Sequence, residues 1–464
     1  IVPPVVICEP RQVPGLSADI LWSFDCGNAN NDRSNTSQYN GIGINSPGYV
    51  NHDYSGQNAA LWLDHYKKQY INISQPIDYT MKSLAISAWI RLFLKPGLQY
   101  GTILSQCGIS NNTANCLRCE VRKDGGLNNM IMYFELNGKT VIGSSPIAIS
   151  QWQHVAFVFN NKTMRQSIYL NGRLDNEIEA TGLVSQMDFQ TTPIIGTHDR
   201  SFENFYSGII DQLTFSFRAK SAGEILDEAT LLVHYQFNSS AQLYNDSGPN
   251  GILGKGSNVS FDASSSSLLL DTYSSYYRSS NLLLGSNVTS YSYSFSMWLT
   301  ILSKISIGMR IPLVRLSVVT PTTGTETCLA ILRIDATDFV LTQYPRPSSS
   351  VIFTYNNTIK ENNPFHVAVT YNDSNTTLSL YINGNVVGSS NVSSVSSLVN
   401  TENHVILTIG HTNDSPSFLD LCNVYLGYDV LYHYISFIGM VDDVRLYSRV
   451  LTADEIKTFV SIRR

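Results

Sequence analysis

The stretch QWQHVAFVFNNKTMRQSIYLNGRL, residues 151–174, decides the fold because it occurs twice in the chain. Its second copy is NPFHVAVTYNDSNTTLSLYINGNVV, residues 363–387, which places His366 212 positions after His154. Self-similarity at a regular spacing indicates that a structural unit is repeated. Both copies alternate apolar and polar side chains, as strands with one buried face do. The repeat therefore predicts a sheet protein built from two copies of one unit.

Three further blocks extend the repeat in the same order. LAISAWIRL at 84–92 recurs as YSFSMWLTI at 293–301, PIIGTHD at 193–199 recurs as LTIGHTND at 407–414, and YSGIIDQLTFSFRAKSAGEILDE at 206–228 recurs as FIGMVDDVRLYSRVLTADEIKTF at 437–459. Matching strands, ILWSFD and LLVHYQF, open the two copies. We therefore expect one domain at 17–229 and a second at 230–464. Residues 1–16 have no counterpart, and an insertion follows Gly410 in the second copy.

Turn and cap signals complete the pattern. Asn-Gly pairs at 171–172 and 383–384 predict tight hairpin turns with positive backbone angles. Only SAGEILDEA and LTADEIKTF look helical, and each begins with a capping box. The two boxes pair Ser221 with Glu224 and Thr452 with Glu455. Many short strands and two short helices predict an all-β fold of two tandem jelly-roll sandwiches, preceded by an extended N-terminal segment.

The order of these blocks resembles the laminin-G-like jelly-roll domains of the concanavalin A-like lectin and glucanase superfamily. The motifs are a tryptophan strand, H-V-A, L-Y-I-N-G, I-G, G-x-[IVM]-D-[DQ]-[VL] and a short T-A-x-E-I helix. The resemblance covers nearly the whole chain, once per copy. It implies two concanavalin A-like jelly rolls and leaves the function open, since this fold hosts lectins, pentraxins, adhesion modules, hydrolases and spacers.

Composition excludes some partners and indicates an extracellular setting. Charged residues make up 14% of the chain and the formal net charge is -6, with no run of five or six like charges. Nucleic acid is therefore excluded as a partner, because phosphate binding needs clustered Lys and Arg. The longest apolar runs, such as 83–94, are shorter than the roughly 20 residues of a membrane span. The start at Ile1, without an initiator Met, is typical of a secreted chain after signal-peptide removal.

Sequons for N-linked glycans support the secretory route. N-x-S/T sequences begin at Asn35, Asn72, Asn111, Asn161, Asn238, Asn245, Asn258, Asn287, Asn356, Asn372, Asn375, Asn391 and Asn413. We expect an extracellular glycoprotein.

The seven cysteines predict disulfides, with one thiol left over. Cys116 and Cys119 form a lone C-x-x-C without a second pair or a histidine at zinc spacing, so a disulfide is favoured over a metal site. The expected pairs are Cys107 with Cys116, Cys26 with Cys119, and Cys328 with Cys422. Cys8 is then spared, or it pairs with Cys26.

Catalytic motifs are absent from the sequence. The resemblance implies that a hydrolase of this superfamily would carry E-x-D-x-E or E-x-D-x-x-E on one strand, and no such run occurs. G-x-S-x-G and H-E-x-x-H are absent too. We expect no enzyme, no cofactor and no metal. Calcium is the alternative, because the resemblance implies it and the loops at 197–204 and 411–417 contain suitable oxygen ligands.

Aromatic residues and histidines have mainly structural interpretations. His154 and His366 lie in alternating strands and are expected to pack there, as are Trp22, Trp89, Trp152 and Trp298. The insertion NVYLGYDVLYHYISF, residues 423–437, has no repeat partner. It is either an extra hairpin that packs its own tyrosines or a contact surface for sugar or protein. Its candidate contact residues are Tyr425, Tyr428, Tyr432 and Tyr434.

The N-terminal segment IVPPVVICEP is a candidate donor strand. Its prolines favour an extended chain, and an apolar extended segment needs a sheet edge that pairs its amides. The residues that would form the strand are Val2, Val5, Val6, Ile7 and Cys8. Either the segment folds back on its own first domain, or it adds to the sandwich of a neighbouring chain. Addition to a neighbour is head-to-tail and propagates into a filament.

These observations predict a secreted, non-catalytic glycoprotein that serves as the structural subunit of an extracellular filament. Its partners would be copies of itself, its own N-linked glycans, and extracellular carbohydrate. The alternative is a carbohydrate- or calcium-binding adhesion module.

Overall fold

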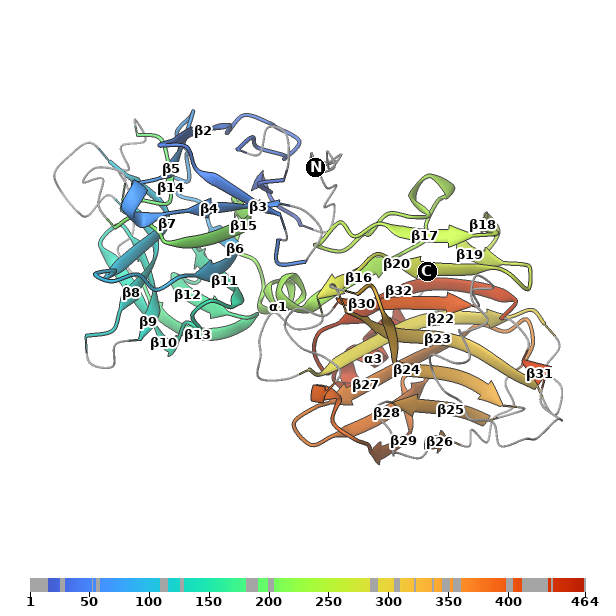
Figure 1. Cartoon of the computed structure of the whole chain (residues 1–464). Helices are drawn as coiled ribbons and strands as arrows, with labels where there is room; N and C mark the ends of the chain where they lie inside the picture. The colour runs from blue at the N-terminus through green and yellow to red at the C-terminus, as the bar shows by residue number, and fades with distance from the viewer. Residues whose placement is uncertain are drawn as a thin grey trace. The chain divides into compact units, whose positions relative to one another are not determined.

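The computed structural model consists of two compact units, unit 1 (Leu16–Thr230) and unit 2 (Leu231–Arg464) (Figure 1). Within them the structure describes residues 16–25, 30–51, 53–55, 59–108, 116–125, 129–180, 191–198, 204–283, 291–303, 309–320, 323–335, 338–343, 351–353, 360–397, 404–410, 433–434 and 437–462. Each unit is a sandwich of two sheets.

Unit 1 pairs sheets A and B. In order across the sheet, sheet A contains β13 (Arg173–Glu179), β12 (Arg165–Leu170), β11 (Trp152–Asn160), β6 (Leu84–Leu92), β15 (Gly208–Ser216), β4 (Ala59–Leu63) and β3 (Gly48–Asn51), with β1 (Ile20–Trp22) beside β15. Sheet B contains β10 (Lys139–Pro146), β9 (Met130–Leu136), β8 (Cys116–Lys123), β7 (Tyr100–Cys107), β14 (Ile194–Ile195), β5 (Tyr70–Ile73) and β2 (Gly41–Ile44).

Unit 2 repeats the same strand order in sheets C and D. Sheet C contains β18 (Val259–Asp262), β19 (Ser267–Leu270), β32 (Gly439–Tyr447), β22 (Tyr293–Ile301), β27 (Phe365–Asn372), β28 (Thr377–Ile382) and β29 (Asn385–Asn391), with β16 (Leu231–Tyr235) beside β32. Sheet D contains β17 (Gly254–Ser257), β20 (Tyr276–Ser279), β30 (His404–Gly410), β23 (Met309–Val319), β24 (Glu326–Asp335), β25 (Asp338–Gln343) and β26 (Val351–Phe353), with β21 (Leu282–Leu283) beside β30 and β31 (His433–Tyr434) parallel to β23. The predicted all-β fold of two jelly rolls is confirmed.

Helical structure is confined to short segments. They are α1 (Ala222–Thr230), α3 (Ala453–Ser461) and the 3-10 turns η1 (His65–Lys67), η3 (Ser240–Gln242) and η4 (Val395–Ser397). Both predicted capping boxes are confirmed: the Glu455 backbone N–H donates to the Thr452 hydroxyl, and the Glu224 N–H to the Ser221 hydroxyl. Among the described residues, no helix has the length and apolar character of a membrane span.

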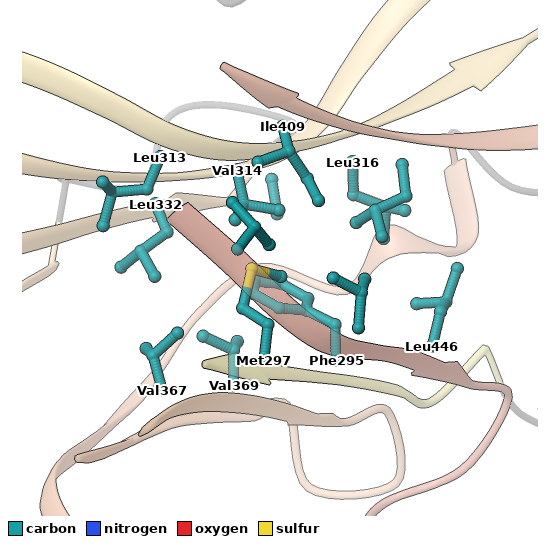
Figure 2. Packing of buried hydrophobic residues seen from close by; sticks show 14 of the residues in the cluster. Phe295, Met297, Leu313, Val314, Leu316, Leu332, Val367, Val369, Ile409 and Leu446 are labelled. Atoms are coloured by element: carbon teal, nitrogen blue, oxygen red, sulfur yellow. The ribbon is translucent and has the colours of Figure 1, made fainter. Parts of the chain in front are cut away.

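The alternating pattern explains the core of each sandwich. In unit 2, Phe295 and Met297 of β22 point from sheet C toward Leu316 of β23 and Ile409 of β30 in sheet D (Figure 2). The side chains between them on each strand face away from the core. Four of the five tryptophans are buried as predicted, with Trp22 fully enclosed, whereas Trp62 is 39% exposed.

The Asn-Gly turns close equivalent hairpins in both units. Asn171 and Gly172 have φ values of 50° and 80°, and Asn383 and Gly384 have values of 49° and 79°. Two successive positive φ angles define the tight turn that the sequence predicts.

Candidate functional site

Three rows of side chains cross β7, β8 and β9 on the outer side of sheet B. Leu117, Cys119 and Val121 of β8 face the core, so the residues between them point outward. The register places the rows side by side. The rows are Tyr100, Arg122 and Ile131; Thr102, Glu120 and Tyr133; and Ser105, Arg118 and Glu135. We call these nine residues the sheet B face.

Glu120 lies at the centre of the face and is fully buried. Its carboxylate accepts a hydrogen bond from the Thr102 hydroxyl at 3.0 Å. Nε and Nη2 of Arg122 both lie 2.8 Å from Glu120 Oε2. A buried carboxylate is tolerated only with such partners, so Glu120 holds Arg122 in one position.

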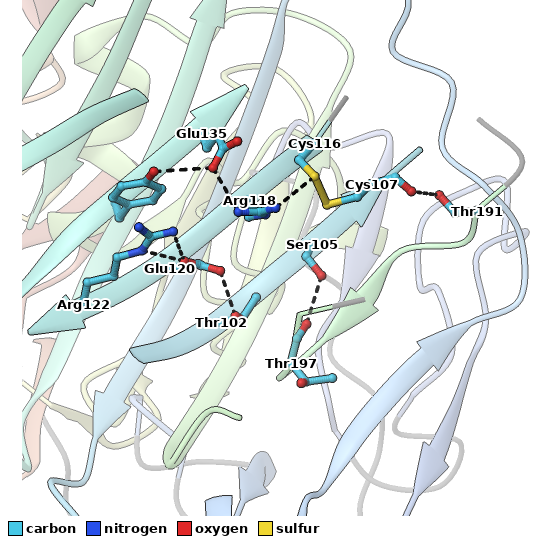
Figure 3. Close-up of a disulfide and its surroundings, with 11 residues drawn as sticks. Thr102, Ser105, Cys107, Cys116, Arg118, Glu120, Arg122, Glu135, Thr191 and Thr197 are labelled. Carbon is cyan, nitrogen blue, oxygen red and sulfur yellow. Dashed lines mark hydrogen bonds and ion pairs between the residues drawn. A yellow bond between two sulfur atoms is a disulfide. The ribbon is translucent and has the colours of Figure 1, made fainter. Parts of the chain in front are cut away.

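Glu135 forms the second ion pair of the face (Figure 3). Nη1 of Arg118 lies 3.2 Å from Glu135 Oε2, and the Tyr133 hydroxyl donates to the same oxygen at 3.4 Å. Burial raises the pKa of Glu135, and the positive charges of Arg118 and Arg122 oppose that shift. Nη2 of Arg118 also lies 3.2 Å from the sulfur of Cys116.

Two aromatic rings, from neighbouring rows of the face, flank Arg122. The guanidinium of Arg122 lies over the Tyr133 ring, 3.2 Å from its centroid, and 5.4 Å from that of Tyr100. Tyr100 is 42% exposed, while the Arg122 side chain is 24% exposed. An exposed ring beside polar groups with fixed positions can stack on an apolar surface and orient the hydroxyl groups of a ligand.

A disulfide between Cys107 and Cys116 joins the ends of β7 and β8 beside the face. Cys119 carries a free, buried thiol, so the expected bond from Cys119 to Cys26 is wrong. The physical reason is strand alternation: Cys119 lies an odd number of residues after Cys116 and therefore faces the core. Burial raises the pKa of the Cys119 thiol well above its usual value.

The other cysteines bear only partly on the predicted pairs. Cys328 is disulfide-bonded. Cys8, Cys26 and Cys422 lie outside the described residues. Within the described part of the chain, one group of potential metal ligands has its atoms within 4.8 Å of one another: Cys107, Cys116 and His198. Its two sulfur atoms are bonded to each other, so the group is not a metal site in this form.

The equivalent face of unit 2 has different chemistry. Arg315 of β23 occupies the place of Ser105. Each pairs with the residue directly before the repeated I-G motif, Thr408 in unit 2 and Ile194 in unit 1. Nη2 of Arg315 lies 2.8 Å from Glu326 Oε1, and burial lowers the pKa of Arg315 to about 10. The positions that match Arg118 and Glu135 are Ile331 and Thr342. The Arg118–Glu135 pair therefore has no equivalent in unit 2, whereas Arg333 and Asp335 occupy the places of Glu120 and Arg122 with their charges exchanged.

The two repeated histidines are packing residues, as predicted. His154 and His366 are buried, and each ring lies edge-on against the repeated tryptophan, with centroids 5.4 Å apart. Their backbone N–H groups donate to the Asn171 and Asn383 side chains of the hairpin turns. Burial lowers the pKa of His154 to about 3 and that of His366 to about 4.

Several predicted site residues fall outside the described part of the chain. These are the strand residues Val2, Val5, Val6, Ile7 and Cys8, the insertion residues Tyr425, Tyr428 and Tyr432, and most of the two calcium-loop candidates. The backbone of Tyr434 lies in β31, opposite Arg310 of β23. These predictions stay predictions.

The described sequon asparagines differ in exposure. Exposed are Asn35, Asn238, Asn245, Asn258, Asn375 and Asn391; partly buried are Asn72, Asn161 and Asn372; outside the described residues are Asn111, Asn287, Asn356 and Asn413. The exposed six offer the most accessible amides for a glycan.

Sequence reasoning missed the sheet B face, although a signal was present. CLRCEVRK at 116–123 alternates apolar residues with Arg118, Glu120 and Arg122. Charges at every second position of a strand mark one polar side, but their partners on β7 and β9 depend on strand register.

Both units of the chain resemble known proteins. The family model described as the concanavalin A-like lectin/glucanases superfamily matches residues 65–226 and 271–457, once in each unit. No curated protein matches the chain. Several solved structures are similar to it at low identity.

Domains LG4-5 of the mouse laminin alpha1 chain are 12% identical, cover 88% of this chain and 93% of their own, and have a TM-score of 0.26. The heptameric SAP-like pentraxin of Limulus polyphemus is 22% identical, covers 32% of this chain and 70% of its own, and has a TM-score of 0.28. Domain 4 of AbnA, an extracellular arabinanase of Geobacillus stearothermophilus in complex with arabinotriose, is 14% identical, covers 48% of this chain and 100% of its own, and has a TM-score of 0.35.

Proposed function

This chain belongs to the concanavalin A-like lectin/glucanases superfamily, and we propose that it is a secreted, non-catalytic, lectin-like module whose sheet B face binds a neutral carbohydrate. The observation that carries the proposal is the exposed Tyr100 ring beside Arg122, which Glu120 holds in place. A pyranose needs such a ring for stacking and such fixed donors for its hydroxyl groups.

The ion pairs favour binding over cleavage. Glycoside hydrolysis needs one carboxyl group as acid and a second, about 5 Å or more away, as nucleophile or base. Glu120 and Glu135 are the carboxylates of this face, and each is engaged by an arginine. A guanidinium occupies the carboxylate lone pairs, which opposes nucleophilic attack on a sugar.

The balance of charge on the face favours a neutral ligand. Arg118 and Arg122 are matched by Glu135 and Glu120, and each pair lies within hydrogen-bonding distance. An anionic sugar would have to compete with a carboxylate for each guanidinium. The hydroxyl oxygens of a neutral sugar can accept hydrogen bonds from the remaining arginine N–H groups without breaking either ion pair.

Calorimetric titration with neutral oligosaccharides, chosen from a glycan array, tests this function. Tyr100→Ala should weaken binding by about 3- to 10-fold, because an aromatic contact contributes about 0.5 to 1.5 kcal/mol. The control is Tyr273→Ala, which removes a 65% exposed tyrosine from unit 2 and should change nothing. Equal affinity in the Tyr100→Ala variant would overturn the assignment of the site. Loss of binding in EDTA would instead assign the binding site to the calcium-loop candidates at 197–204 and 411–417.

We also propose that the secreted chain is the subunit of an extracellular filament, joined by its N-terminal strand. The observation that favours this second function is β29, a long, uncharged edge strand in sheet C. Strand addition to such an edge of a neighbouring chain is heterologous and need not close. Negative-stain microscopy should show fibres for the intact chain and single particles for a chain lacking residues 1–15. Single particles in both samples would sink this function.

Secretion with glycosylation is a separate part of the proposal. The exposed sequon asparagines, such as Asn35 and Asn375, support it. Peptide-N-glycosidase treatment of the native protein should lower its mass and leave Asp at each occupied position. An unchanged mass would contradict glycosylation.

A further inference from the structure

Edge strands differ sharply among the four sheets. The ends of the sheets are β13 and β3 in A, β10 and β2 in B, β18 and β29 in C, and β17 and β26 in D. Five of these strands, β2, β3, β17, β18 and β26, have no more than four residues. A short edge offers few backbone groups to a strand from another molecule. The longer edges β10, β13 and β29 offer an added strand more backbone groups.

The long edges of unit 1 are protected. β13 has the sequence RLDNEIE, in which four of seven residues are charged. Charged side chains on an edge strand oppose pairing with another chain. β10 is covered by side chains from β13: Asp175 accepts from the backbone N–H groups of Ser144 and Ser145, both at 3.0 Å, and Asn176 donates to the Ile142 carbonyl at 2.8 Å.

β29 occupies the place of β13 in unit 2 and has none of this protection. The two strands share their register and their bulge, since Asn176 lies opposite Ile168 and Gly388 lies opposite Leu380. Gly388 and Val387 therefore replace Asn176 and Asp175.

The sequence of β29, NVVGSSN, contains no charge, and Val386 is 59% exposed. Among the described strands at the ends of the four sheet orders, β29 alone has more than four residues and no charge.

We propose that β29 is the acceptor edge for residues Val5–Cys8 of a second copy of this chain. This inference rests on the proposed filament. The segment matches the edge in chemistry, because Val5–Cys8 is also uncharged and β-prone. Pro4 and Pro10 limit its strand to the residues between them, since proline cannot donate to a ladder. That length fits within the seven residues of β29.

The sequon at the end of β29 leaves the edge free. Asn391 Oδ1 accepts from Thr377 Oγ1 of the paired strand β28 at 3.4 Å, so the side chain lies over the sheet rather than beyond its edge. A glycan at Asn391 would therefore begin on the face of sheet C. The groups that an incoming strand needs are backbone groups along the opposite side of β29.

Transfer of the β13 charges to β29 tests the acceptor in the intact chain. Asn385→Arg with Ser389→Glu reproduces Arg173 and Glu177 at the matching positions. Fibres should disappear in negative stain, and sedimentation should show the mass of one chain. The matched control, Leu253→Arg with Ala263→Glu, adds the same charges at exposed loop positions of unit 2 and should keep the fibres.

The outcomes separate the acceptor from the filament. Fibres that persist in the Asn385→Arg, Ser389→Glu variant, but vanish when residues 1–15 are removed, overturn β29 as the acceptor and leave the filament standing. Single particles of the unmodified chain overturn both. An excess of a synthetic peptide of residues 1–10 should shorten the fibres of the intact chain. A peptide of scrambled sequence should not, and equal shortening by both would count against strand pairing.

Discussion

At the scale of single residues, unit 1 buries an ion pair where unit 2 has apolar side chains. Lys220 Nζ lies 2.5 Å from Oε1 of Glu228 in α1, and both side chains are buried. Ser87 donates to Glu228 Oε2 at 3.0 Å. The capping boxes align Lys220 with Leu451 and Glu228 with Phe459. The same fold therefore tolerates either an ion pair or two apolar side chains at these two positions.

Breaking the pair should destabilise unit 1 more than replacing it. Lys220→Met leaves Glu228 buried without its cation and should lower the free energy of unfolding by about 3 to 5 kcal/mol. The double variant Lys220→Leu with Glu228→Phe copies unit 2 and should lose much less, because no charge stays buried. Urea unfolding, followed by hydrogen exchange of β11 and α1, measures both. A double variant as unstable as the single one would contradict this account.

Stability should fall in mild acid because of the buried histidines. The pKa of His154 is about 3 in the folded chain and about 6.5 when unfolded. Between these values the unfolded state binds more protons, so this contribution is complete above about pH 6.5 and is lost as the pH falls toward 3. The slope for one histidine is up to about 1.4 kcal/mol per pH unit.

Urea unfolding of His154→Gln at pH 7 and pH 5 measures this effect. The difference in unfolding free energy between the two pH values should be smaller than in the unmodified protein. His65→Gln, at a partly exposed position in η1, is the control and should leave the difference unchanged. An identical pH dependence in all three proteins would rule out His154 as its source.

At the scale of elements, the two hairpin glycines have unequal surroundings. A Cβ on Gly172 would lie 2.9 Å from the Leu226 Cα in the backbone of α1. A Cβ on Gly384 would lie 3.3 Å from Lys457 Cγ. Both residues have positive φ, which costs about 1 to 2 kcal/mol for any other L-residue.

Gly172→Ala should therefore destabilise its unit more than Gly384→Ala does. The second substitution should cost little beyond the backbone term, because a lysine side chain can move aside. The first must also displace α1 from β11 and β13. Comparison of the two variants by thermal unfolding tests this expectation. An equal loss of stability in both would show that α1 can shift without destabilising unit 1.

At the scale of the whole molecule, each unit has a hydrophobic core of its own. The core of unit 1 is centred on residues such as Ile86, Phe134 and Phe157, and that of unit 2 on Phe295, Leu332 and Val369. A unit with its own core can unfold as one cooperative step.

We therefore expect the effects of substitutions to stay within a unit. Lys220→Met should lower the hydrogen-exchange protection of sheets A and B and leave sheets C and D unchanged. Gly384→Ala should do the reverse. Loss of protection throughout the chain in either variant would show that the two units unfold together.

Sequence reasoning reached the fold through features that are local. Strand alternation, the Asn-Gly turns and the capping boxes depend on neighbours within a few residues, and the repeat showed each of them twice. It failed at Cys119, where pairing was assigned by elimination although alternation points the thiol into the core. It also missed Arg118, Glu120 and Arg122. Alternating charges on a strand are common, and they indicate a site only when the residues beside them on the neighbouring strands are known.

The sequence by itself determined that this protein is two copies of one jelly roll. The alternation of buried side chains along a strand and the residues of a tight turn depend only on neighbours in the sequence. Only the tertiary structure decided where the copies differ. Strand register brings Thr102, Arg122 and Tyr133 around Glu120 in unit 1. It also shows that Val387 and Gly388 take the places from which Asp175 and Asn176 cover an edge. Both differences join residues far apart in sequence, and such contacts exist only after the sheets have formed.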